Sequence, residues 1–291
     1  MADNLTGKRV VLDLGGSRIA VHRCGAGPAV VCMHAIGHGA RDFERLSAQL
    51  KPQYDIIAID WPGHGGSLPD DKPVDASHYC QLLAETMDAL EVPSAYLLGN
   101  SIGGAVAMLY AASHPQRVQG LILCNPAGLQ PVGLVARLVC SHMARFFGRG
   151  VKGSARFPAQ FRRYYERDVL PSLPAKWRRD EIIASARQSA PILQQAWKGF
   201  ARPDADLRDL PPKLSCPVLL AWAKKDKYIS WGRSKDAARG FSNSVIQLFD
   251  GGHSAFLEAP ELFITALQSF IETASQSAGA PAGALKIRGL A

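Results

Sequence analysis

A serine lies in a closely spaced glycine pattern at residues 99–103, Gly-Asn-Ser-Ile-Gly. An apolar run, residues 95–98, precedes it, and small helix-forming residues follow from 104 to 112. This strand–turn–helix pattern is the G-x-S-x-G nucleophile elbow, in which a strained turn pushes the serine hydroxyl out of the backbone. The flanking glycines are needed because side chains there would collide with the strand or the helix. The pattern predicts that Ser101 is a nucleophile, with the free N–H groups of the next helix aimed at an oxyanion.

The segments on both sides of this turn alternate in character, and they must position it. A hairpin is predicted over 8–14 and 18–23, buried strands over 29–33, 54–60, 118–124, 217–222 and 245–249, and helices over 41–50, 76–90, 101–114, 230–239 and 258–271. Strands that alternate with helices indicate a mostly parallel sheet covered by helices on both faces. Sites in such sheets form at the carboxyl ends of the strands, where Ser101 would meet the loops beginning at His34 and Asn125.

Length and composition narrow the class of protein. A chain of 291 residues, 47% of them hydrophobic, can bury a large core as one domain or as one domain with an inserted lobe. The six cysteines form no C-x-x-C pair and have no metal-ligand spacing, so we expect reduced thiols and no metal. No window of about 18 uncharged apolar residues is present, and the first residues lack the apolar core of a signal peptide. A cytoplasmic protein without a transmembrane segment is therefore expected.

Residues 127–213 interrupt the alternation. They contain no buried strand, only helix-like stretches at 132–147, 158–170 and 179–200. We therefore predict a core formed by 1–126 and 214–273, a helical lid over 127–213, and a disordered tail over 274–291. The lid also holds 16 basic against 7 acidic residues, an excess of nine, whereas the whole chain has a net charge of +8. The excess positive charge is thus confined to the lid.

Three further motifs resemble the α/β-hydrolase superfamily, over roughly residues 8 to 273. His34-x-x-Gly37 is similar to the family's His-Gly-x-Gly oxyanion loop, with Ala35 in place of the first glycine. Residues 60–67 (Asp-Trp-Pro-Gly-His-Gly-Gly-Ser) match a common family loop, and 252–260 match the loop that carries the catalytic histidine. The resemblance implies an α/β-hydrolase fold with a mostly parallel eight-stranded sheet, helices on both faces and an inserted helical lid.

The family's order of catalytic residues, Ser…Asp…His, then falls on Ser101, Asp226 and His253. An imidazole activates the serine hydroxyl, and a carboxylate fixes its tautomer and stabilises its charged form. The backbone N–H groups of Ile36 and Ile102 would hold the oxyanion. Asp250 is the rival acid, although its place three residues before the histidine favours a turn cap. His38, His64 and Trp61 are interpreted as pocket wall or loop structure.

The resemblance implies that the protein is a carboxylic ester or thioester hydrolase. It would act on a small-molecule substrate through an acyl-enzyme, without a cofactor. The alternative is a C–C bond hydrolase of aromatic ring-fission products, whose elbow is similar to Gly-Asn-Ser-x-Gly-Gly. Those enzymes bind a substrate carboxylate with a lid arginine, and Arg187 occupies the expected position. They usually carry tryptophan after the histidine, where this chain has Ser254. His34 and Asn100 are further candidates for substrate binding, although the histidine at the position of His34 more often braces the oxyanion loop in this family. A ligand-binding receptor of the same fold with little turnover is the alternative from another class.

The basic lid leaves three interpretations open. Its arginines could bind an anionic substrate, solvate helix faces, or attach the amphipathic stripe at 134–147 to an anionic membrane surface. Nucleic acid is not expected as a partner, because no binding motif accompanies the charge. The sequence does not indicate an oligomeric state.

Overall fold

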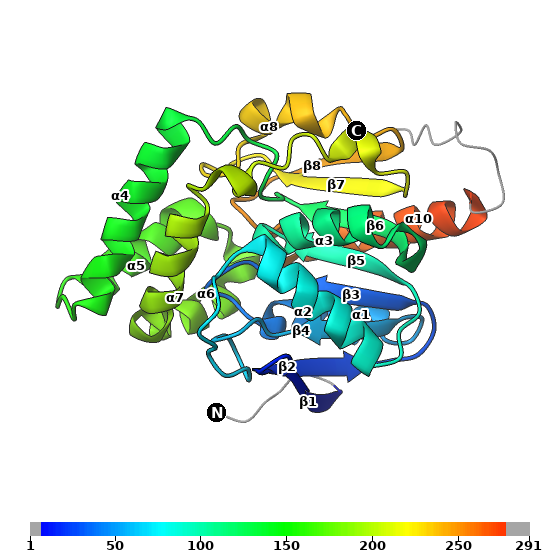
Figure 1. Ribbon diagram of the computed structural model, residues 1–291, viewed down its shortest axis with the longest axis horizontal. Coiled ribbons are helices and arrows are strands. Elements are labelled where there is room, and N and C mark those ends of the chain that lie inside the picture. The colour runs from blue at the N-terminus through cyan, green and yellow to red at the C-terminus, as the bar shows by residue number, and fades with distance from the viewer. Residues whose placement is uncertain (1–6, 278–291) are drawn as a thin grey trace.

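The structure, a computed structural model, describes residues 7–277 and contains one eight-stranded sheet (Figure 1). The strands are β1 (Lys8–Leu14), β2 (Ser17–Cys24), β3 (Ala29–Met33), β4 (Asp55–Ile59), β5 (Ala95–Asn100), β6 (Val118–Cys124), β7 (Val218–Ala223) and β8 (Ser244–Phe249). Their order across the sheet is β1-β2-β4-β3-β5-β6-β7-β8. β2 pairs antiparallel with β1 and with β4, and all the other pairs are parallel. The predicted fold class, a mostly parallel sheet of eight strands, is confirmed.

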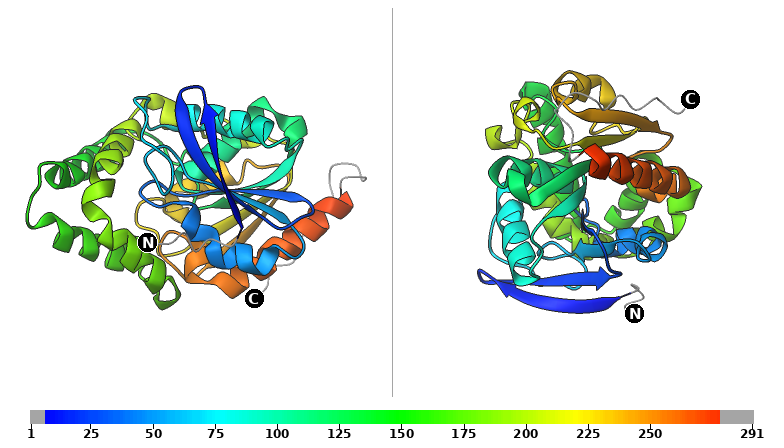
Figure 2. Two further views of the ribbon diagram at one scale, coloured as in Figure 1. Left: turned by 90° about the horizontal axis from the view of Figure 1, so that it is seen from below. Right: turned by 90° about the vertical axis from the view of Figure 1, so that its right-hand side faces the viewer.

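Three of the central strands are buried along their whole length because helices cover both faces of the sheet. Every residue of β4, β5 and β7 is buried, as their continuous apolar sequences predict. Helices α2 (Ala76–Ala89) and α3 (Ile102–Ser113) lie on one face, and α1 (Glu44–Leu50) and α10 (Pro260–Ser277) lie on the other (Figure 2). The helices α8 (Trp231–Ala238) and α9 (Ala255–Glu258) complete the core.

Four α-helices are inserted between β6 and β7, at the end of the sheet where the parallel strands finish (Figure 1). They are α4 (Leu134–Val151), α5 (Phe157–Tyr164), α6 (Lys176–Ala184) and α7 (Ala186–Gly199). The predicted stretch 179–200 is divided at Ser185, whose hydroxyl donates to the carbonyl of Ile182 at 2.9 Å and so competes with the helical backbone. We call residues 127–213 the inserted segment.

The last helix is longer than the sequence suggested. α10 continues to Ser277, because apolar side chains on its inner face stay buried as far as Ala274. The predicted tail over 274–291 therefore begins too early, since residues 274–277 are helical. Residues 278–291 lie outside the described part of the chain. Within residues 7–277 no helix is both long enough and apolar enough to span a bilayer.

Candidate active site

The turn at Ser101 has the strained geometry that its glycines predict. Ser101 has φ +56° and ψ −117°, a left-handed conformation that is costly for a residue with a side chain. A Cβ on Gly99 would lie 2.3 Å from the carbonyl oxygen of Gly103, and one on Gly103 would lie 2.3 Å from that of Met33. Glycine at both positions lets β5, α3 and β3 approach closely enough to hold Ser101 at the carboxyl edge of the sheet.

His253 and Asp226 meet at the same edge. His253 Nδ1 lies 2.6 Å from Asp226 Oδ2, and the carboxylate side chain is fully buried. Burial alone would lower the pKa of His253, but the charge and hydrogen bond of Asp226 outweigh it and raise that pKa. An imidazole held in this way has a fixed tautomer, with Nε2 free to act on a hydroxyl group. Asp250 instead pairs with Lys225 at 2.8 Å.

Backbone and side-chain donors hold the Asp226 carboxylate from its other sides. The N–H groups of Tyr228 and Ile229 donate to Oδ1 at 2.8 and 2.9 Å, and the amide of Asn125 donates to Oδ2 at 2.9 Å. Asn125 itself is fully buried, has a φ of +38°, and accepts from the N–H of Ala223 at 2.8 Å. The carboxylate is therefore fixed at the end of β6 and β7 rather than on a solvated turn.

Glu258 holds the loop that carries His253. Its Oε2 accepts from the backbone N–H groups of Gly252 at 2.7 Å and of His253 at 2.9 Å. Its Oε1 accepts from the hydroxyl of Ser172 at 2.9 Å, so one side chain joins this loop to the inserted segment. Burial raises the pKa of Glu258.

Two buried imidazoles shape the loop after β3. His34 Nδ1 donates to the carbonyl of Ala35 at 2.7 Å, and its Nε2 accepts from the N–H of Trp61 at 3.1 Å. His64 Nε2 accepts from the N–H of Gly37 at 2.8 Å. Burial is the largest cause that lowers the pKa of His64, which falls to about 3. Both rings are therefore neutral, and their hydrogen bonds stabilise the loop that carries Ile36. Since both nitrogens of His34 bind backbone groups, this residue does not have the substrate-binding position expected for it.

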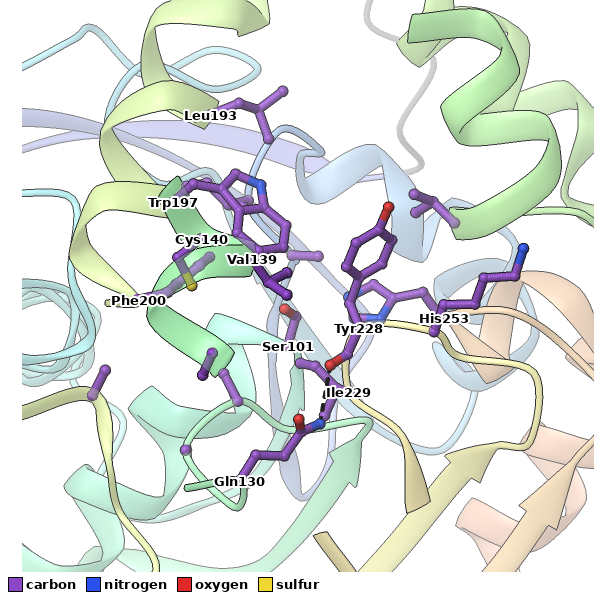
Figure 3. A pocket seen from close by; sticks show the side chains of 18 of the residues that line it. Ser101, Gln130, Val139, Cys140, Leu193, Trp197, Phe200, Tyr228, Ile229 and His253 are labelled. Carbon is purple, nitrogen blue, oxygen red and sulfur yellow. Dashed lines mark hydrogen bonds between the residues drawn. The ribbon is translucent and has the colours of Figure 1, made fainter. Parts of the chain in front are cut away.

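A cavity of about 400 Å³ lies over Ser101, between the sheet and the inserted segment (Figure 3). Ile36, Ser101 and His253 line it from the core, and most of its remaining wall is apolar or aromatic. Val139, Leu193, Trp197 and Phe200 come from the inserted segment, and Tyr228 and Ile229 from the loop after β7. The N–H of Ile102 is the first of α3, so it has no partner one helical turn earlier. The cavity thus joins a candidate nucleophile, an imidazole and two candidate oxyanion donors.

Arg187 and Asn100 lie elsewhere than predicted. Arg187 is exposed on α7 and is not part of the cavity wall, because this helix turns Leu193 and Trp197 toward the cavity and Arg187 away from it. Asn100 is fully buried beneath the turn, where its amide donates to the carbonyls of Cys124 and His253, both at 3.0 Å. Its oxygen accepts from the hydroxyl of Ser254 at 2.7 Å. Asn100 therefore joins two loops instead of contacting a substrate.

Sequence reasoning gave no role to Asn125, Glu258 or Asp42. A polar residue directly after a buried strand was a signal for Asn125, and Glu258 lay inside the recognised histidine motif. No signal existed for Asp42, which binds Arg178 across 136 positions of sequence. Within residues 7–277, no cluster of three or more histidine, cysteine or acidic side chains could hold a metal ion.

Comparisons with known proteins bear on the family and the fold. A family model described as the alpha/beta hydrolase fold matches residues 28–260. A pimeloyl-[acyl-carrier protein] methyl ester esterase of Xanthomonas axonopodis is 29% identical over 254 residues, covering 85% of this chain and 96% of the relative. An uncharacterized protein of Mycobacterium tuberculosis is 26% identical, covering 89% and 79%. The solved structure of an esterase from Thermogutta terrifontis superposes with a TM-score of 0.77 at 22% identity, covering 92% and 99%.

Proposed function

The chain belongs to the alpha/beta hydrolase fold family, and we propose that it is a serine hydrolase of carboxylic esters. The observation that carries the proposal is the hydrogen bond of 2.6 Å between His253 and Asp226, beside a cavity that Ser101 and His253 line together. Relatives with the esterase name support ester cleavage as the reaction class.

In the proposed reaction His253 Nε2 removes the hydroxyl proton of Ser101 while Oγ bonds to the ester carbonyl carbon. The N–H groups of Ile36 and Ile102 stabilise the negative oxygen of the tetrahedral intermediate. His253 then gives its proton to the departing alcohol, and the acyl group stays on Ser101. A water molecule, activated by the same imidazole, releases the acid and restores the serine. Asp226 keeps the imidazole in the tautomer that both steps require.

The test is turnover of p-nitrophenyl esters and labelling by a fluorophosphonate probe, each compared between wild type and Ser101→Ala. Wild type should hydrolyse at least one ester and bind the probe covalently, and the variant should do neither. Equal behaviour of the two proteins would refute the proposal. A panel with methyl esters of different acyl length and matched thioesters then defines the substrate class.

The C–C bond alternative has lost the support of Arg187, which does not line the cavity. None of the 16 basic residues of the inserted segment does so either, which speaks against an anionic substrate group held by these side chains. Arg233 of α8 is the arginine in the cavity wall, and its guanidinium donates to the carbonyl of Tyr228 at 3.0 Å. We therefore favour esters whose enclosed part is largely uncharged.

We further propose that the beginning of α4 contacts an anionic lipid surface. Leu134, Val135 and Leu138 are 74%, 68% and 62% exposed, beside the cavity wall formed by Val139 and Cys140 of the same helix. Seven basic residues and no acidic residue occur between positions 126 and 165. Exposed apolar side chains within a basic surface suit insertion between acidic lipid headgroups.

Sedimentation with vesicles tests this contact. A larger fraction of the protein should sediment with vesicles that contain phosphatidylglycerol than with pure phosphatidylcholine vesicles. Added salt should reduce this difference. Leu134→Ser/Leu138→Ser should reduce binding several-fold, with the exposed Leu262→Ser on α10 as the matched control. Equal retention of the double variant and wild type would contradict the contact.

A further inference from the structure

The amide and the two cationic side chains that line the cavity already have partners. The amide nitrogen of Gln130 donates to the carbonyl of Tyr228 at 3.1 Å, and Lys227 pairs with Asp168. Arg233 donates to backbone carbonyls, as described above. Ser101 and His253 belong to the proposed reaction. His38 is the lining imidazole that the reaction does not use.

His38 is held by a second imidazole–carboxylate pair. Its Nδ1 lies 2.6 Å from Oδ2 of Asp42, and the two side chains are 1% and 0% exposed. The other oxygen of Asp42 accepts from Nε of Arg178, also at 2.6 Å, and Arg178 is itself buried. Burial alone would raise the pKa of Asp42, but His38 and Arg178 hold it well below its ordinary value. Asp42 is therefore an ionised acceptor on both oxygens.

This arrangement fixes which ring nitrogen of His38 is left for another partner. Because Asp42 is a carboxylate, Nδ1 of His38 must carry the donated proton. Nε2 lies on the opposite edge of the ring, and among residues 7–277 it has no hydrogen-bond partner. A polar nitrogen without a hydrogen-bond partner at the wall of a mostly apolar cavity raises the free energy of the protein. A bound molecule that forms a hydrogen bond with it removes this cost.

We propose that Nε2 of His38 binds a hydroxyl group of the ester substrate, close to the scissile bond. His38 lies two residues after Ile36, a candidate oxyanion donor, on the same loop, and both residues line the cavity. A hydroxyl is the matching group because it donates to a neutral imidazole and accepts from a charged one. The hydroxyl belongs either to the acyl chain or to the alcohol part, and this inference rests on the proposed ester hydrolysis.

Matched substrates test the proposal. Butyl butyrate is compared with butyl 3-hydroxybutyrate, which carries the hydroxyl in the acyl chain, and with a glycerol monobutyrate, which carries it in the alcohol part. Wild type should prefer one of the hydroxylated esters about 2- to 10-fold in kcat/KM, as expected for one net hydrogen bond. The preference should appear mainly in KM, because His38 binds the substrate instead of reacting with it.

Two variants separate this role from loop structure. His38→Asn can keep a donor toward Asp42 but lacks an atom at the Nε2 position, so the preference should fall to about one-fold while the plain ester is still cleaved. His38→Gln can place an amide near the Nε2 position and should keep part of the preference. Binding of the same esters to Ser101→Ala, measured by calorimetry, gives a second readout that does not depend on turnover.

The outcomes are distinct. A wild type without preference for either hydroxylated ester overturns the proposal, and so does a preference that His38→Asn leaves unchanged. Equal loss of activity on all three esters in His38→Asn assigns His38 to loop structure alone and also overturns it. No turnover of any ester and no fluorophosphonate label refutes the proposed function instead, and the calorimetry then decides whether the hydroxyl is bound.

Discussion

Replacement of Asn100 by alanine should disconnect the nucleophile turn from the loop that carries His253. The amide of Asn100 makes three buried hydrogen bonds, to the carbonyls of Cys124 and His253 and from the hydroxyl of Ser254. Asn100→Ala removes all three bonds, although the carbonyl of Cys124 still accepts from the N–H of Ser101. A buried polar group without a partner costs about 1–3 kcal/mol.

The three losses do not add in full, because the removed amide leaves space for about one water molecule that can satisfy some of the partners. We therefore expect the free energy of unfolding to fall by about 2–4 kcal/mol. Release of the His253 carbonyl also lets the imidazole shift relative to Ser101. A displacement of about 1 Å can cost about 10²-fold in rate, so kcat should fall by that order with little change in KM.

Urea unfolding and steady-state ester hydrolysis measure the two effects. Ser254→Ala is the matched control, because it removes one bond and leaves both carbonyl contacts of Asn100. It should cost about 1 kcal/mol and less than about 10-fold in kcat. A raised KM at unchanged kcat in Asn100→Ala would refute this reasoning and return Asn100 to the substrate-binding role first expected for it.

Three further variants test the neighbouring structure. Asp226→Asn should lower kcat about 10³- to 10⁴-fold, and the acid limb of the remaining kcat/KM should move to lower pH. The sign follows because His253 must be unprotonated to act as a base and Asp226 raises its pKa; an unmoved limb would contradict this. Arg178→Met should cost about 3–5 kcal/mol in urea unfolding by leaving Asp42 without its buried cation, whereas the exposed Arg187→Met should change stability by under about 0.5 kcal/mol and leave KM unaltered. Gly37→Ala should lower both stability and kcat, since φ is +78° and its Cβ would lie 2.9 Å from Leu193; wild-type values in both assays would show that the loop adapts.

The sheet could be predicted because the sequence patterns that indicate its strands are local. Continuous apolar strands such as 29–33 and 217–222, and the two glycines around Ser101, depend on short-range sterics and on burial of a whole segment. The contact of Asp226 with His253 followed from the order of motifs in a known family.

The predicted substrate-binding residues failed for a different reason. Whether Arg187 meets the cavity depends on the rotation of α7 about its own axis, which Leu193 and Trp197 set by packing. Asn100 and His34 are polar residues next to the nucleophile and the oxyanion loop, and sequence does not say whether such a side chain points into the cavity or beneath it. The tertiary hydrogen bonds to Ser254 and Trp61 decide this.

The inserted segment is tied to the core unevenly. Arg178 binds Asp42 and Ser172 binds Glu258, so the part around α6 is fastened to the loops that carry Ile36 and His253. The first turns of α4, on the other side of the cavity, are exposed. From this uneven attachment we infer that movement that admits substrate involves the first turns of α4, while the loops that carry Ile36 and His253 stay assembled. The free energy of ordering those loops is then supplied once, during folding, and does not recur as a barrier in each catalytic cycle.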